Sequence, residues 1–222
     1  MIMEKKTIVV VGAGRGLGNH VAKRFGKEGF RVILMARNGQ TLKVYEQEFT
    51  AERIEVYTHV VDAARPETLT EALYWVKSTF GIPDVLVYNV GITTPDKSGK
   101  IDSEELMYRY QVDVASAYHC ICQITDEEFG QKKGTIILTG GGLALYPSAD
   151  YLPLSLDKAA LRAMAYALHE TLKPKDIFVG TVTVCGAIGG DGPFAPLRIA
   201  ESYWEMYNER GECETVYAGT NK

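Results

Sequence analysis

Hydrophobic positions along the chain alternate between short continuous runs and longer segments with a helical period. Thr7–Val11 is a β-branched run that ends at a glycine, and Gly16–Glu28 then carries apolar residues at helical spacing. Short continuous apolar runs indicate strands that are buried on both faces. Further strands are predicted at Arg31–Ala36, Ile54–Val61, Asp84–Asn89, Gly134–Gly142 and Ile177–Val184. Helices are predicted at Gln40–Ala51, Pro66–Thr79, Ser103–Phe129 and Pro153–Leu172, and less regularly at Pro196–Glu209 before a last short strand at Glu214–Gly219.

This alternation predicts an α/β fold, a doubly wound parallel sheet of the Rossmann-like kind with helices on both faces. Asp102 with Glu105 three residues later forms a capping box that opens the long central helix. No repeat, linker or low-complexity segment interrupts the pattern, so residues 1–222 are interpreted as a single domain. Residues 186–222, which follow the last long strand, are expected to form a short substrate lid and a C-terminal segment.

Composition and charge narrow the possible partners. The net charge of −4 argues against a nucleic-acid partner, because phosphate binding needs a basic face. No apolar run reaches the length of a membrane span, and the first apolar run flows into glycines in the manner of a buried strand, not of a signal peptide. The four cysteines and four histidines show no disulfide or metal-ligand spacing, so we expect free thiols, no metal and a cytoplasmic location.

The glycine-rich turn between the first strand and the first helix predicts a phosphate-binding site. Amide N–H groups and a helix N-terminus attract an anion at such a turn. The spacing is Gly-x-x-x-Gly-x-Gly at Gly12, Gly16 and Gly18, with Leu17 where the common dinucleotide fingerprint needs its third glycine. We expect Gly12, Arg15, Gly16, Leu17 and Gly18 to contact the cofactor.

From this spacing onward the chain resembles the short-chain dehydrogenase/reductase family over about residues 5–190. Asp62 and Ala63 in "VVDAA" resemble the family's adenine-contacting aspartate and its neighbour, and Asn89 and Gly91 in "YNVG" resemble its Asn-Asn-Ala-Gly motif. The resemblance also covers the loop that lies beside nicotinamide, and it implies cofactor contacts from Gly186 and Ile188 in "VCGAI" and from Lys158. Val11 and Cys185 depart from the family's usual threonine and proline.

Two arginines favour NADP(H) over NAD(H). An acidic residue at the end of the second strand would accept hydrogen bonds from the ribose 2′-hydroxyl, but here Ala36 is followed by Arg37. Arg15 lies in the glycine loop. Both guanidinium groups can pair with a 2′-phosphate, and the family has basic residues at both places in its NADP-preferring members. The alternative is that both are solvated surface arginines.

The catalytic side chains that the resemblance implies are mostly replaced. The family uses a tyrosine as proton donor, a lysine four residues later, a serine thirteen residues before the tyrosine and an asparagine in the central helix. Lys158 is present, but the tyrosine position holds Leu154, the serine position Gly141 and the asparagine position Asp113. Lys158 is explained by ribose binding with or without catalysis.

Several residues are candidate replacements, each with a structural alternative. Tyr151 precedes Lys158 by seven residues in the entry to the helix, where it can fold towards the cofactor or pack at the pocket rim. Ser155 lies near Lys158 on the helix, Tyr146 lies in the loop before it, and Thr139 stands at a strand end. Asp113 can pair with Lys158 or be a solvated helix charge.

Two hypotheses follow. The first is an NADP(H)-dependent oxidoreductase with a small carbonyl or alcohol substrate and the catalytic set Lys158, Tyr151, Asp113 and Thr139. The second is a non-catalytic NADP(H)-binding sensor or scaffold protein. By analogy with the family, we expect a homodimer or homotetramer that associates through the two long central helices. Phe194, Trp204 and Tyr207 form either an apolar wall of the substrate pocket or, for the last two, the buried face of a helix.

Overall fold

A seven-stranded parallel sheet is the centre of the computed structural model, which describes residues 5–96 and 101–219. The strand order is β3-β2-β1-β4-β5-β6-β7. The chain therefore adds β2 and β3 on one side of β1, and then adds β4 to β7 on the other side. The strands are β1 (Thr7–Val11), β2 (Arg31–Ala36), β3 (Val56–Val60), β4 (Val85–Tyr88), β5 (Thr135–Gly141), β6 (Phe178–Val184) and β7 (Glu214–Tyr217). The α-helices are α1 (Leu17–Lys27), α2 (Gly39–Ala51), α3 (Pro66–Phe80), α4 (Ser103–Tyr110), α5 (Ser116–Ile124), α6 (Glu127–Gln131), α7 (Leu152–Leu172) and α8 (Pro196–Glu209). The predicted α/β, single-domain Rossmann-like fold is confirmed.

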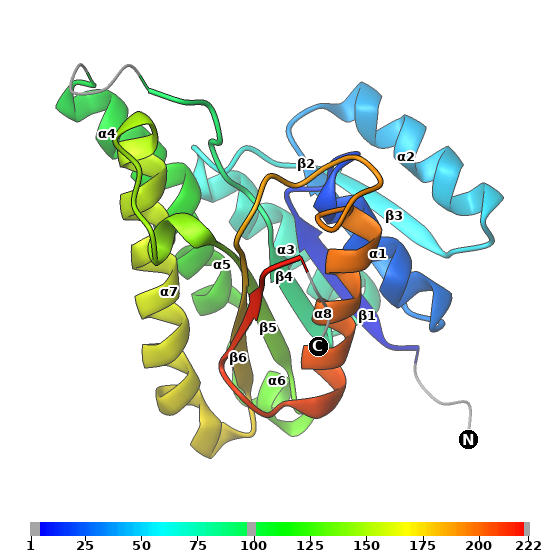
Figure 1. Ribbon diagram of the computed structural model, residues 1–222. Helices are drawn as coiled ribbons and strands as arrows, with labels where there is room; N and C mark the ends of the chain where they lie inside the picture. The colour runs from blue at the N-terminus through cyan, green and yellow to red at the C-terminus, as the bar shows by residue number, and fades with distance from the viewer. Residues whose placement is uncertain (1–4, 97–100, 220–222) are drawn as a thin grey trace.

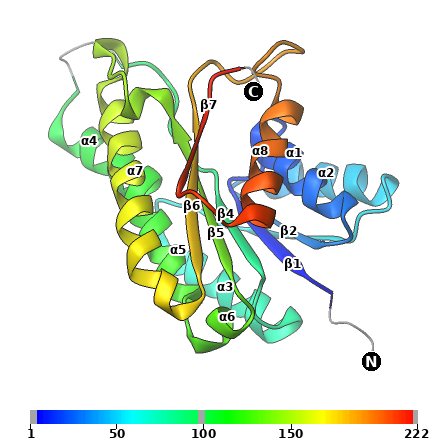
Figure 2. The ribbon, with the colours of Figure 1, turned by 60° about the horizontal axis from the view of Figure 1, so that its bottom comes forward.

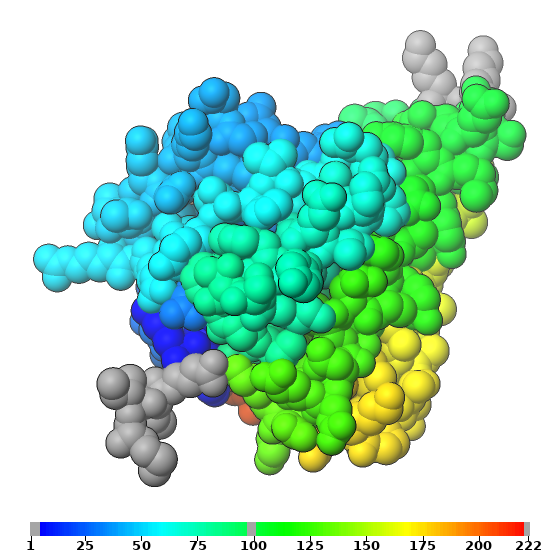
Figure 3. Space-filling model, turned by 180° about the vertical axis from the view of Figure 1, so that it is seen from behind, coloured from blue at the N-terminus to red at the C-terminus, as the bar shows by residue number. Residues whose placement is uncertain are grey.

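Helices cover both faces of the sheet (Figure 1). On one face α3, α5 and α7 pack against strand residues such as Val9 and Leu138, and on the other α1, α2 and α8 pack against residues such as Val10 and Val182. The two helical layers flank the strands in the second view (Figure 2). From behind, α3 and the α4–α5 segment lie side by side over the sheet (Figure 3). Among the described residues, no helix is long and apolar enough to cross a membrane.

The prediction of one continuous helix from Ser103 to Phe129 is wrong. The α-helix is interrupted in its middle, and its last predicted residues belong to a separate short helix. A π-helical turn, Gln111–Ala115, joins α4 to α5, and α5 ends at Ile124. Asp126 then caps a separate short helix through a hydrogen bond from the N–H of Phe129. The side-chain hydroxyl of Tyr88 donates to the carbonyl of Val112 in the π turn, at 2.5 Å. This turn is the only π-helical segment in the described part of the chain, and such turns often occur at functional sites.

The C-terminal helix and strand belong to the body of the fold. Trp204 and Tyr207 are half-buried and pack edge-to-face with Phe25 of α1, and neither lines a cleft at the carboxyl end of the strands. They therefore form the buried face of α8, and the alternative of a substrate wall is wrong for these two residues. Phe194 alone stays beside that loop, where its ring packs against Tyr217 of β7.

Glu214 on β7 joins three elements through its carboxylate. It accepts hydrogen bonds from the Nε and Nη2 of Arg162 on α7, from the Tyr166 hydroxyl and from the Thr183 hydroxyl of β6, at 2.5–3.0 Å. Its side chain is 6% exposed. Burial alone raises the pKa of Glu214, but the hydrogen bonds from Arg162, Thr183 and Tyr166 outweigh burial, and the net pKa lies below the ordinary value.

Glu214→Ala is expected to reduce the free energy of unfolding by about 2–4 kcal/mol at pH 7, because it leaves the buried Thr183 hydroxyl and Arg162 without their acceptor. Since the folded-state pKa of Glu214 is lowered, this stabilisation is present above the unfolded-state pKa and disappears as the pH falls through the folded value. Urea unfolding at pH 7 and pH 3.5 measures both effects. Glu201→Ala is the matched control, because the Glu201 side chain is 40% exposed in its pair with Arg24 and should change stability by less than about 1 kcal/mol. An equal loss in both variants would contradict the argument.

Candidate functional site

The candidate site lies at the carboxyl end of the strands, where the crossovers reverse between β1 and β4. Ligands of open α/β sheets bind at this crevice. Two clefts meet there. The side cleft, of about 240 Å³, lies beyond the ends of β1, β2 and β4, and the central cleft, of about 740 Å³, lies beyond β4, β5 and β6. Asn89, Val90 and Gly91 line both clefts, so the two form one groove around the end of β4.

The glycine loop after β1 is built for close approach of main chain to main chain. Gly12 has φ +93°, and a Cβ there would lie 2.7 Å from the carbonyl carbon of Asn89. A Cβ on Gly18 would lie 2.5 Å from the carbonyl oxygen of Gly12. The side-chain amide of Asn89 donates to that same oxygen at 3.0 Å and ties the loop to β4. Both glycines are therefore required by the packing of the turn.

The N-terminus of α1 is open towards the groove. Gly16 is its N-cap and provides no side-chain acceptor; the Asn19 N–H donates to the Gly14 carbonyl at 3.0 Å, and among the described residues the amide groups of Leu17 and Gly18 have no side-chain cap. Leu17 and Gly16 line the central cleft, and a Cβ on Gly16 would meet no heavy atom within 4 Å. Free amide groups, open space and a helix N-terminus together fit a pyrophosphate.

The side cleft has the residues that were expected to contact adenine and its ribose. Asp62 and Ala63 line it, and the Asp62 carboxylate accepts from the N–H of Ala64 at 3.0 Å. Arg37 lines the same cleft and also a surface hollow along α2. Arg15 and Arg37 are both exposed, and within residues 5–96 and 101–219 neither forms an ion pair. The Arg15 backbone N–H donates to the Tyr45 hydroxyl at 3.1 Å, which fixes the base of the loop.

Leu154 closes the place where the family's tyrosine would stand. It is 6% exposed and lines the central cleft with its apolar side chain. The stem of Lys158 occupies the neighbouring space, since a Cβ on Gly141 would lie 3.3 Å from the Lys158 Cγ. A side chain at Gly141 would therefore press against the lysine. Both replaced positions line the central cleft, and neither provides a side-chain hydrogen-bond donor.

Lys158 provides the buried ammonium group of the cleft. Its Nζ donates to the carbonyl oxygen of Thr139 at 2.8 Å. Burial lowers the pKa of Lys158, while the charges of Asp113 and Asp157 act in the opposite direction. A Cβ built on Gly91 would lie 3.5 Å from this Nζ and 3.6 Å from the Asp113 Oδ2, so the two groups face the same point beside the groove.

Asp113 belongs to the π turn and is completely buried. The alternative that it is a solvated charge on a helix surface is therefore wrong. Both of its oxygens accept from the N–H of Ile92 at 3.0 Å, and the charge of Lys158 acts on it more strongly than that of Arg109. Burial raises the pKa of Asp113, and the charge of Lys158 opposes the rise. Asp113 lines neither cleft, so it acts on the site through Lys158 and the main chain of Ile92.

Two of the candidate hydroxyl groups already have partners. Thr139 donates to the Asn89 Oδ1 at 2.9 Å, and its hydroxyl lies 2.8 Å from that of Tyr203. Ser155 donates to the Tyr151 carbonyl at 2.8 Å and accepts from the N–H of Ser148 at 3.1 Å. Both hydroxyls stabilise the strand end and the helix entry. Thr139 also lines the central cleft, and its catalytic role stays a prediction.

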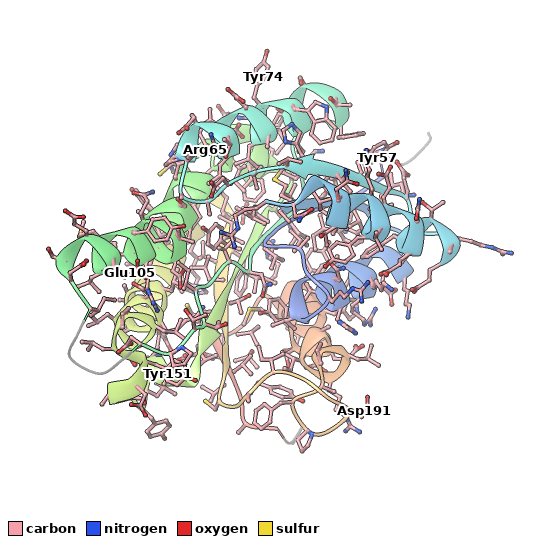
Figure 4. The ribbon with its side chains drawn as sticks, turned by 90° about the horizontal axis from the view of Figure 1, so that it is seen from above. Tyr57, Arg65, Tyr74, Glu105, Tyr151 and Asp191 are labelled. Carbon is pink, nitrogen blue, oxygen red and sulfur yellow. The ribbon has the colours of Figure 1, made fainter. Side chains whose placement is uncertain are left out.

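Tyr151 lies at the entry to α7 in a 3-10 turn, Ala149–Tyr151, and not in a free segment. It is half-buried and lines the central cleft together with the more exposed Tyr146. Seen from the carboxyl end of the strands, Tyr151 lies on the α7 side and Asp191 lies across the sheet end on the loop after β6 (Figure 4). Gly186 and Ile188 of this loop line the cleft, and the Phe194 ring lies where a side chain at Gly186 would go.

Asp157 was not predicted as a site residue. It is 1% exposed and lies on α7 next to Lys158 in sequence. Neither of its carboxylate oxygens has a hydrogen-bond partner among the described residues. Burial raises the pKa of Asp157 to about 7, the charge of Asp113 adds to the rise, and Lys158 and Arg109 oppose it. Its only signal in the sequence is an acidic residue beside Lys158. Among the described residues no group of His, Cys, Asp and Glu has a metal-binding arrangement.

Comparison with known proteins finds one family model and several relatives that are similar to this chain. The family model described as short chain dehydrogenase matches residues 6–190. A 3-oxoacyl-[acyl-carrier-protein] reductase of Staphylococcus epidermidis is 27% identical over 169 residues, which cover 72% of this chain and 69% of the relative. A diacetyl reductase ((S)-acetoin forming) of the same species is 26% identical over 175 residues, covering 78% and 68%.

Solved structures share the fold at lower identity. A metagenomic short-chain oxidoreductase in complex with NADP has a TM-score of 0.85 and 24% identity, with 95% of this chain and 96% of that chain covered. L-Sorbose reductase from Gluconobacter frateurii, complexed with NADPH and L-sorbose, has a TM-score of 0.85 and 23% identity, with 93% and 91% covered.

Proposed function

This chain belongs to the short-chain dehydrogenase family, and from that premise we propose that it is an NADP(H)-dependent oxidoreductase of small carbonyl or alcohol substrates with an atypical proton donor. The two reductases named above act on carbonyl groups according to their names. Two of the similar structures contain NADP or NADPH. The family supports the class of reaction, and the geometry of the groove supports the cofactor and the roles of individual residues.

One observation carries the proposal: the groove is continuous from Arg37 and Asp62, past the open α1 N-terminus, to Lys158. Gly12 and Gly18 keep the turn close to β4, and open space beside Gly16 leaves room for a pyrophosphate. Gly91 and Gly186 would hold the nicotinamide end, with Lys158 towards the ribose. When bound, NADPH supplies the hydride. The chain's own groups orient the dinucleotide, exclude water and supply the proton at the substrate oxygen.

Arg37→Ala is expected to weaken NADPH binding at least tenfold and to leave NADH binding within about threefold, because one guanidinium pair with the 2′-phosphate is worth about 1.5–3 kcal/mol. Titration of cofactor fluorescence with both nucleotides measures the two affinities. Arg198→Ala, an exposed arginine on α8, is the control. Equal affinity of the unaltered protein for NADH and NADPH would contradict the preference.

Leu154→Tyr is expected to raise the rate of NADPH-dependent ketone reduction by at least tenfold. The new phenol would enter the central cleft one helical turn before Lys158, whose positive charge favours the phenolate and makes the phenol a better acid. A panel of small ketones, followed by NADPH absorbance, measures the change. Leu154→Phe is the matched control because it adds the ring without the hydroxyl. Equal rates for the two variants would show that a hydroxyl at this position gives no benefit.

A non-catalytic NADP(H)-binding sensor or scaffold is the second candidate, and the replacements of tyrosine and serine by Leu154 and Gly141 favour it. Tyr151 and Tyr146 remain proton-donor candidates at the cleft mouth. The ketone panel with the unaltered protein, Tyr151→Phe and Tyr146→Phe separates the cases. Binding of NADPH without any turnover supports the second candidate, and turnover that one of these variants abolishes identifies the donor.

We also propose a homodimer or homotetramer. Several large apolar side chains are exposed on α4, α5 and α7, the helices that were predicted to associate; these are Met107, Tyr108, Tyr110, Tyr118, Leu156 and Tyr166. A cytoplasmic location stays a prediction. Sedimentation of the unaltered protein measures the assembly, and a monomer at micromolar concentration would contradict it.

A further inference from the structure

A buried cluster of charges lies directly behind the central cleft, between α4, the π turn and α7. It contains the buried cations Arg109 and Lys158 and the buried carboxyl groups Asp113 and Asp157, and the exposed Glu105 lies at its edge. Glu105 lies on α4 and Tyr151 lies at the start of α7, and these two helices are in contact on this side of the molecule (Figure 4). Lys158 is the member that reaches the cleft.

One carboxyl group of this cluster, Asp157, favours its protonated form, because it is buried and has no hydrogen-bond donor among the described residues. The Nε of Arg109 lies 2.7 Å from the Glu105 Oε1, which satisfies the first cation and the first carboxylate. Lys158 and Asp113 face each other beside Gly91 and form the second pair. Asp157, which is 1% exposed, has no such partner: neither of its oxygens accepts a hydrogen bond from the described residues. A buried charge without a partner is strongly unfavourable, so the cluster retains a proton.

Asp113 and Asp157 are the two carboxyl groups between which that proton is shared. Burial and the charge of Asp113 raise the affinity of Asp157 for a proton, and the charges of Lys158 and Arg109 oppose them. The Asp113 carboxylate has the backbone N–H of Ile92 as a donor, whereas the Asp157 oxygens have no partner among the described residues. The proton therefore resides mainly on Asp157. Interacting carboxyl groups titrate as one unit.

We propose that Lys158 is the proton donor of this enzyme, and that the carboxyl pair Asp113–Asp157 controls the acidity of Lys158 through the proton that the pair shares. This inference rests on the proposed function. In the reduction, the carbonyl carbon gains the hydride, the carbonyl electron pair moves to oxygen, and that oxygen takes a proton from the Lys158 Nζ. The neutral amine regains a proton from solvent. Leu154 has no proton to give, and Lys158 is the buried ionisable group of the cleft.

The shared proton makes this donor depend on pH. While the pair holds its proton, Lys158 faces one negative charge in a buried site and releases its proton readily. Once the pair loses the proton, two carboxylates face Lys158 and hold its positive charge more firmly. Reduction should then slow as the pH rises through about 7, where Asp157 ionises. Arg109, which forms an ion pair with Glu105, is the other charged group that acts on Asp157.

Asp157→Asn is the main test, because it retains the volume of the side chain and removes the titration. For the unaltered protein, kcat/KM for ketone reduction should fall at least tenfold between pH 6.5 and pH 8.5. Asp157→Asn should lose less than threefold over that range. Glu105→Gln, which changes the exposed carboxylate of the same cluster, should retain the fall. The same fall in Asp157→Asn would overturn the proposal.

Urea unfolding provides a readout that does not depend on activity. The pKa of Asp157 is raised in the folded state, so the folded chain binds an extra proton between about pH 4 and pH 7, and its free energy of unfolding declines as the pH rises through that window. The midpoint urea concentration of the unaltered protein should fall by about 1–2 M from pH 5 to pH 8 relative to that of Asp157→Asn. Parallel midpoints would disprove the shared proton. Failure to bind NADPH would refute the proposed function, while the unfolding comparison would still judge the carboxyl pair.

Discussion

Gly18→Ala is expected to abolish measurable NADPH binding, with a dissociation constant at least a hundredfold higher. The added Cβ would lie 2.5 Å from the carbonyl oxygen of Gly12 and 3.0 Å from the side-chain nitrogen of Asn89. These two neighbours hold the turn against β4, because the Asn89 side-chain amide donates a hydrogen bond to the Gly12 oxygen. The loop must therefore move away from the groove, and we expect a loss of about 2–3 kcal/mol in the free energy of unfolding as well.

Gly14→Ala is the matched control for this substitution. It lies in the same loop, but its Cβ would meet no heavy atom within 4 Å. Cofactor fluorescence titration and urea unfolding of both variants measure the two effects. If Gly18→Ala binds NADPH as well as Gly14→Ala does, the turn is not the pyrophosphate site.

Lys158→Met is expected to lower the rate of ketone reduction by about 10²–10⁴-fold, the usual effect of losing a general acid. Methionine keeps an unbranched stem against Gly141 but removes the ammonium that faces Asp113. The carboxylate that remains is buried without a cation, so the free energy of unfolding should fall by about 3–5 kcal/mol at pH 8 and by less at pH 5, where the carboxyl pair takes up protons.

Lys175→Met, an exposed lysine after α7, provides the control for loss of a positive charge. Stopped-flow measurement of NADPH oxidation gives the rate, and a separate titration gives the NADPH affinity, so that ribose binding and proton donation are distinguished. An unchanged rate at saturating NADPH would assign the proton to Tyr151 or Tyr146 instead.

The sheet could be predicted from the sequence because its strands are buried on both faces. Thr7–Val11 and Arg31–Ala36 have the predicted bounds, and every residue of Thr7–Val11 is buried. The edge strand β3 is shorter than predicted, because Tyr57 and Val60 on it are exposed and the apolar pattern alone does not mark its ends. The break after Ile124 was missed because Asp126 serves as a cap only once the chain has turned.

The glycine turn of the candidate site could be predicted from the sequence, and the charge cluster could not. Glycine spacing reports backbone geometry directly, so Gly12 and Gly18 could be identified from the sequence. Asp157 has the spacing of an ordinary helix charge, and its burial depends on how α4 and the π turn pack against α7. Those elements lie some fifty positions earlier in the chain, so the sequence pattern around Asp157 does not indicate that its side chain is buried.

The anchoring of the loop after β6 has a consequence for the order in which this protein becomes active during synthesis. The Tyr217 hydroxyl donates to the Pro193 carbonyl at 2.7 Å, and the Phe194 ring packs against both Gly186 and Gly219. Ribosomes release the chain from its N-terminus, and domains fold as their segments emerge. The glycine turn and Lys158 can thus be in place while the loop beside them still lacks its anchor. The nascent chain would hold an unfinished pocket until β7 emerges and pairs with β6.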